Sequence, residues 1–102
     1  MPDVYYILGF NSKEAGKNKS AAKYLALATR KSKKNSTINI RSKISLAELY
    51  FNQKKFSKAI PLYEKALRSL KDKWWTKDSF NLAWCYYRVG KKDKAISKMK
   101  EN

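Results

Sequence analysis

One internal repeat constrains the fold of this chain more than any other feature. The segment SLAELYFNQKKFSKAI at 45–60 returns as NLAWCYYRVGKKDKAI at 81–96. A Leu-Ala pair, a tyrosine and an Ala-Ile pair recur with the same offset of 36 positions, as Tyr50 and Tyr86 show. A period of about 20 to 50 residues is typical of arrays in which each unit buries its apolar face against its neighbours.

Helical periodicity runs along most of the chain. Its clearest case is one apolar face formed by Phe56, Ala59, Ile60, Tyr63, Ala66, Leu67 and Leu70. Pro61 is tolerated only near a first turn, so this helix is predicted to begin close to Ser57. Similar patterns predict helices over 3–14, 19–32, 38–53, 76–89 and 92–101, with a loop at 31–37 and a stop at Gly90. We therefore predict an all-α fold of six helices in three pairs.

The first pair repeats the later ones more faintly. Leu8-Gly9 precedes Leu46-Ala47 by 38 positions, and Gly16 precedes Lys54 by the same distance. The two additional residues fit in the loop at 31–37. The chain is thus predicted to be a single domain, 1–102, with repeats of about 2–37, 40–73 and 76–102.

These positions resemble the tetratricopeptide repeat (TPR) family, whose unit is a helix–turn–helix of about 34 residues. The second unit carries the pattern as Leu46, Ala47, Tyr50, Phe56, Ala59, Tyr63 and Ala66, and the third as Leu82, Ala83, Tyr86, Gly90 and Ala95. Two positions depart from it, because Ser12 replaces a tyrosine and Lys92 replaces an aromatic residue. The resemblance implies three stacked units in a right-handed α–α superhelix.

The third unit ends without the polar capping helix that such arrays usually have. Ile96 and Met99 are therefore expected near an uncovered end. Either the chain is a fragment of a longer bacterial TPR protein, or another chain covers this end, self-association included.

The opening MPDVYYILGF does not resemble a signal peptide, and no apolar run reaches the roughly 18 residues of a membrane span. We expect a cytoplasmic protein if the chain is complete, and leave the compartment open if it is a fragment of an exported protein.

The resemblance also implies a concave groove, lined by a second stripe on the first helix of each unit. The candidate partner-binding residues are Tyr6, Phe10, Arg41, Ile44, Phe51, Lys77, Phe80, Asn81, Trp84, Tyr87 and Arg88. An aromatic floor with basic surroundings predicts a peptide or helix with acidic and apolar residues as partner. The alternative is that these aromatic residues only pack neighbouring first helices together.

A subgroup of the family clamps carboxyl termini with several convergent polar side chains. Lys77 and Asn81 suit such a clamp, but Tyr6, Phe10 and Ser45 stand where its other donors are needed. Trp74 and Trp75, in the link between units, are expected to staple the stack together, with an exposed anchor for a partner as the alternative.

Charge favours an acidic partner, because 24 Lys and Arg residues face 8 Asp and Glu residues, a formal charge of +16. Aromatic and basic residues together also suit RNA or another polyanion, which is our second hypothesis. The lysines are spread over all three units and form no focused stripe, so a protein partner is preferred.

Enzyme chemistry has little support in this composition. The chain has no histidine, three glycines that form no phosphate loop, and one cysteine. Cys85 has no visible base beside it, and we expect it in a packed helix toward the open end, where it would be exposed to oxidation. We predict no catalytic activity, no cofactor and no metal.

Overall fold

The computed structural model describes residues 2–69 and 76–100 of the chain. These residues form six helices and no strand: α1 (Pro2–Glu14), α2 (Asn18–Lys31), α3 (Thr37–Asn52), α4 (Phe56–Ser69), α5 (Thr76–Arg88) and α6 (Lys92–Lys100). The predicted all-α fold and the loop before α3 are confirmed, and the helix ends agree closely with the sequence pattern. Trp74 and Trp75 lie outside the described residues, so their expected role stays a prediction.

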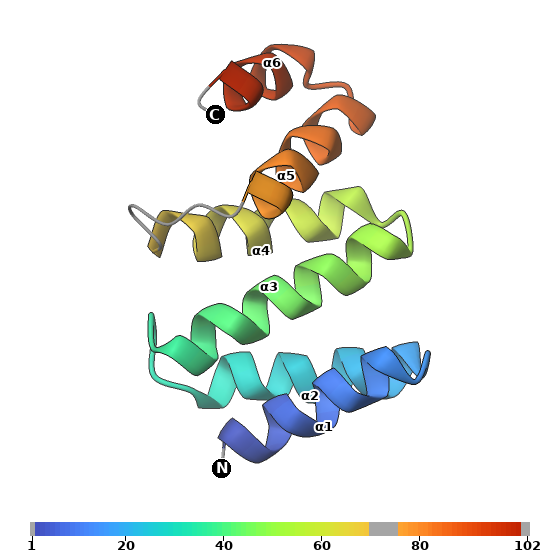
Figure 1. Cartoon of the computed structure of the whole chain (residues 1–102), viewed down its shortest axis with the longest axis vertical. Coiled ribbons are helices and arrows are strands. Elements are labelled where there is room, and N and C mark those ends of the chain that lie inside the picture. Colours follow the sequence, from blue (N-terminus) through green and yellow to red (C-terminus); the bar gives the residue numbers. More distant parts are fainter. Residues whose placement is uncertain (1, 70–75, 101–102) are drawn as a thin grey trace.

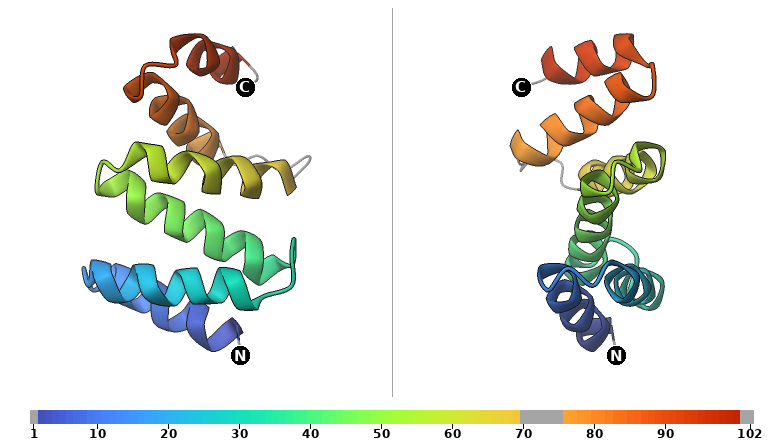
Figure 2. Two further views of the ribbon diagram at one scale, coloured as in Figure 1. Left: turned by 180° about the vertical axis from the view of Figure 1, so that it is seen from behind. Right: turned by 90° about the vertical axis from the view of Figure 1, so that its right-hand side faces the viewer.

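The helices follow one another in chain order along the longest axis of the molecule (Figure 1). The molecule measures 39 × 27 × 18 Å, and the first helix, α1, and the last, α6, lie at opposite ends of the stack. Each helix packs against the next, and the first helices of the pairs also touch in succession, α1 against α3 and α3 against α5. Figure 2 shows the same order from behind and from one side.

The interior is continuous from the first pair to the last. One buried cluster consists of Ala21, Leu25, Leu46 and Leu49, and the other of Ala47, Ala59, Tyr63, Leu67, Leu82, Cys85, Tyr86 and Ala95. Tyr50 and Leu62 pack against both clusters and so join them. The alanines let helix backbones approach, while the tyrosines fill the space between successive pairs.

The three turns between paired helices share one backbone geometry. Gly16, Lys54 and Gly90 occupy equivalent places and have φ angles of +78°, +63° and +88°. In each turn the residue that follows donates its backbone N–H to the carbonyl oxygen five positions before it. These bonds run from Lys17 to Ser12 at 2.8 Å, from Lys55 to Tyr50 at 2.8 Å and from Lys91 to Tyr86 at 2.7 Å. This is the Schellman ending of a helix. The first pair therefore ends its leading helix as the other two do, although its sequence pattern is the faintest.

Two expectations about positions in the helices need correction. Pro61 is the sixth residue of α4, beyond the first turn, although the helix does begin next to Ser57. Proline has no N–H to donate to the carbonyl of Ser57, and this residue is exposed, so water can donate instead. Cys85 does not face the open end. It is completely buried in the larger cluster, where oxidants cannot reach it.

Both ends of the array expose apolar side chains. Ile96 of α6 is 52% exposed, as expected, while the side chain of Met99 lies outside the described part. Val4, Ile7 and Leu8 of α1 are also exposed at the other end, which the sequence pattern did not mark.

Candidate functional site

Three first helices contribute to one small cavity. Tyr6 of α1, Arg41 and Ile44 of α3, and Asp78 of α5 line a hollow of about 240 Å³, together with Ser45. Three of the predicted groove residues, Tyr6, Arg41 and Ile44, thus meet at one place. We name this hollow and the first-helix side chains beside it the groove.

Glu48 connects all three first helices across the groove. One oxygen of its carboxylate accepts a hydrogen bond from Lys13 Nζ of α1 at 2.6 Å, and the other from Lys77 Nζ of α5 at 3.1 Å. Burial alone would raise the pKa of Glu48, but the hydrogen bonds and charges of the two lysines outweigh burial and lower it. Part of the basic charge predicted for the groove is therefore neutralised within the protein.

Asp78 is a second carboxylate in the groove, and the sequence pattern did not single it out. Only 7% of the residue is exposed, and it lies in the first turn of α5. Burial raises the pKa of Asp78, and the nearby charge of Glu48 adds to this effect. A carboxylate at the cavity wall repels acidic groups locally, so acidic residues of a partner suit the basic rim better than the cavity itself.

An aromatic surface continues the groove toward the end of α5. Trp84 and Tyr87 lie with their ring centres 5.7 Å apart, and the guanidinium of Arg88 covers the Trp84 ring at 5.9 Å. Tyr87 and Phe80 are about half exposed, at 48% and 53%. These residues share one face of α5, as their spacing predicts.

Arg88 also joins this surface to the preceding pair of helices. Its guanidinium lies 5.2 Å from the centre of the Phe56 ring, and Phe56 meets Phe51 edge to face at 5.6 Å. Phe51 packs against the larger core cluster. The alternative hypothesis, that the aromatic residues of the groove only pack helices together, therefore fits Phe51. It fits the exposed Phe80 and Tyr87 less well.

The α1 part of the groove is aromatic as well. Tyr6 and Phe10 have ring centres 6.1 Å apart, and Phe10 is 40% exposed. Lys13, which bonds Glu48, also places its ammonium 5.7 Å from the centre of the Phe10 ring.

Two candidate polar residues are occupied by contacts within the protein. The amide of Asn81 donates a hydrogen bond to the buried Tyr63 hydroxyl at 3.3 Å, and Lys77 is paired with Glu48. Each side chain is thus held in place by one hydrogen bond within the protein, and part of its donor capacity is already used.

Residues 2–69 and 76–100 contain no group of three or more Cys, Asp or Glu side chains arranged to hold a metal ion. Within the same ranges, no helix combines the length and the apolar character required to cross a membrane.

Comparison with known proteins gives one match. Residues 40–69, which span α3 and α4, match the family model of the tetratricopeptide repeat. No curated protein and no solved structure matches the chain significantly. The match covers the second predicted repeat, and the turn geometry of the other two pairs is equivalent. The match and the all-helical structure support a TPR-like repeat protein, and such repeats suggest a protein–protein interaction module.

Proposed function

We propose that the groove binds a peptide or helix that carries large apolar residues flanked by acidic ones, and that this recognition involves no chemical step. The observation that carries the proposal is the half-exposed aromatic face of α5, where Phe80 and Tyr87 flank Trp84 beneath Arg88. Exposed aromatic residues that are held in place by neighbours lose little conformational entropy on binding, which makes them effective anchors.

The charges around the groove support a partner with a specific layout. Arg41 and Arg88 are exposed on the rim, whereas Glu48 and Asp78 lie deeper. An apolar side chain fits above the aromatic floor, and carboxylates of the partner suit the two arginines. RNA suits this groove less well, because the carboxyl group of the buried Asp78 disfavours phosphates near the floor, and the charges of Lys13 and Lys77 are partly neutralised by Glu48.

The proposal is tested with a labelled synthetic peptide that alternates aspartate with leucine and phenylalanine. We expect Trp84→Ala to weaken its binding by about tenfold, and by more than any single lysine-to-alanine change, because anchors in an interface centre dominate affinity. Phe80→Ala and Tyr87→Ala, at exposed positions, should weaken binding with little effect on folding. Ile96→Ala is the matched control, because Ile96 is 52% exposed and Phe80 53%, but it lies on α6.

The outcome that contradicts the proposal is a reversed ranking. If Lys77→Ala or another single lysine change weakens binding more than Trp84→Ala, charge alone determines the affinity. Tight binding of single-stranded RNA with a steep dependence on salt, lost in the same lysine variants, would then favour the polyanion hypothesis.

A further inference from the structure

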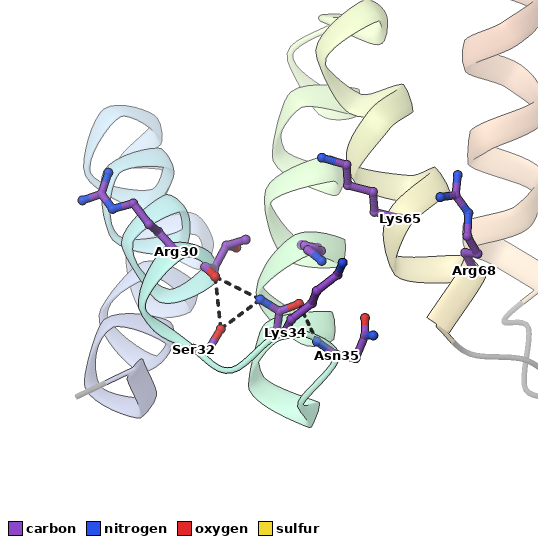
Figure 3. Close-up of a pocket in the computed structure, with 9 residues that line it drawn as sticks. Arg30, Ser32, Lys34, Asn35, Lys65 and Arg68 are labelled. Atoms are coloured by element: carbon purple, nitrogen blue, oxygen red, sulfur yellow. Dashed lines mark hydrogen bonds between the residues drawn. The ribbon is translucent and has the colours of Figure 1, made fainter.

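A second cavity lies between the end of α2, the loop that follows it, α3 and α4. Its volume is about 680 Å³ (Figure 3). Five basic residues line it, namely Arg30, Lys34, Lys43, Lys65 and Arg68. None of the described residues that line it is acidic or aromatic. We name it the basic cavity.

The basic residues come from four separate segments of the chain. Arg30 stands on α2, Lys34 on the loop, Lys43 on α3, and Lys65 with Arg68 on α4. In Figure 3, Arg30 lies on one side of the cavity and Arg68 on the opposite side, with Lys34 and Lys65 between them. The fold thus concentrates charges that are scattered in the sequence.

Lys43 makes this cavity unusual. The residue is only 9% exposed, and no bonding partner of its ammonium is found among the described residues. Burial lowers the pKa of Lys43, and the charges of Lys65 and Lys34 lower it further. The positive charges of Lys34, Lys43 and Lys65 act on one another at the cavity wall, so an anion bound there would reduce this repulsion and stabilise the cluster.

The loop that carries Lys34 is held in a defined shape. Asn39 is 3% exposed, and its amide donates to Thr29 O at 2.9 Å and to Ser32 Oγ at 3.1 Å. Its carbonyl oxygen accepts from the N–H of Asn35 at 3.2 Å. Asn39 therefore fixes the loop, and both of its amide N–H donors are used within the protein, which leaves the charged side chains to recognise an anion.

We propose that the basic cavity binds a compact ligand that carries several phosphate groups. A cluster of five cations matches clustered phosphates better than a single carboxylate, because each phosphate carries more charge and more acceptor oxygens. The absence of aromatic residues from its described lining disfavours stacking of nucleic-acid bases, which single-strand binding proteins use. This site is separate from the groove and does not depend on the function proposed there.

Inorganic tripolyphosphate is the probe for this site, titrated calorimetrically into the full chain at about 0.15 M salt, where exposed charges are screened. We expect Lys43→Met to weaken binding by about tenfold, the effect of losing one charge-assisted hydrogen bond. Lys19→Met removes the same charge from an exposed position on α2, outside the basic cavity, and should change the affinity by less than about twofold. Without ligand, Lys43→Met should melt at the same temperature as the wild type or higher.

A second pair of variants tests the site without altering a buried residue. Lys34→Gln should weaken binding, whereas Lys33→Gln, an exposed neighbour in the same loop that does not line the cavity, should not. Equal effects of Lys34→Gln and Lys33→Gln, or of Lys43→Met and Lys19→Met, would overturn the proposal and indicate diffuse attraction to a basic protein. The proposal also fails if an RNA oligonucleotide of about 15 bases binds more tightly than tripolyphosphate and depends on Lys43.

Discussion

Gly9 of α1 lies so close to Leu25 of α2 that a Cβ atom on the glycine would stand 2.7 Å from Leu25 Cγ and 2.9 Å from the Leu25 backbone nitrogen. The side chain of leucine can shift, but the backbone nitrogen belongs to a helix and cannot. We predict that Gly9→Ala lowers the free energy of unfolding by about 1 to 3 kcal/mol, because the clash outweighs the better helix propensity of alanine. Urea titration followed by circular dichroism measures the change.

Ala15→Gly is the counterpart for Gly9→Ala, since it exchanges the same two residue types at an exposed position after α1. It should change stability by less than about 1 kcal/mol. An alanine at position 9 that leaves stability unchanged or raised would show that the two helices separate easily, in conflict with the tight packing of the first pair.

Lys54 adopts the left-handed backbone conformation that glycine provides in the other two turns. A side chain at positive φ is strained, and glycine there is not. We predict that Lys54→Gly raises the free energy of unfolding by about 0.5 to 1 kcal/mol, even though glycine gains entropy in the unfolded chain. Lys58→Gly, at an exposed position inside α4 without positive φ, should lower it. The prediction is wrong if both variants lose stability equally in thermal melts.

The stability of the folded protein is expected to depend on pH through the ionisation of Glu48. Its lowered pKa means that its two lysine bonds stabilise the folded state fully above pH 4.5 and are lost as pH falls through the folded-state value. Glu48→Gln should therefore cost about 1 to 2 kcal/mol at pH 7, mainly because Lys13, whose side chain is 10% exposed, loses its partner. The cost should shrink progressively as the pH falls below 4.5, as urea titrations at a series of pH values would show.

Glu14→Gln provides the control for Glu48→Gln, because Glu14 lies 3.8 Å from the same lysine but its side chain is 64% exposed. Solvent screens such a pair, so its loss should have almost no effect. If the two variants lower the free energy of unfolding equally, the hydrogen bonds of Glu48 to Lys13 and Lys77 do not stabilise the packing of the first helices.

The repeat predicted the helices and their pairing because both follow from local sequence. The 36-residue offset between Leu46 and Leu82 repeats one helix pair, and each turn residue stands at the position the offset requires. The same reasoning identified Tyr6, Arg41 and Ile44 as groove residues, and these three line one cavity. The buried Asp78 was not identified, because an aspartate in a first turn is expected as an exposed charge.

The basic cavity could not be predicted by the same reasoning. Lys34, Lys43 and Lys65 share no helical spacing, and they meet only because the loop folds back beside α4. Hydrophobic periodicity predicts which residues share one face of one helix. It does not predict a cluster whose residues come from several helices and a loop. The orientation of Cys85 was missed for a related reason, since burial of that face depends on α4 and α6, which contribute Tyr63 and Ala95 to the same cluster.

Cys85 offers a probe for opening of the last helix pair. The residue is completely buried, and burial raises the pKa of its thiol to about 11, so it is neither accessible nor ionised at pH 7. We predict that iodoacetamide labels it at least about a hundredfold more slowly in the folded protein than in urea, because labelling requires opening of α5 and α6. Mass spectrometry measures the rate.

Two variants test whether the core cluster protects Cys85. Leu82→Ala, which removes a side chain from the same cluster, should accelerate labelling, whereas Ile96→Ala at the exposed surface should not. Rapid labelling of the wild type under native conditions would show that the core cluster does not protect Cys85.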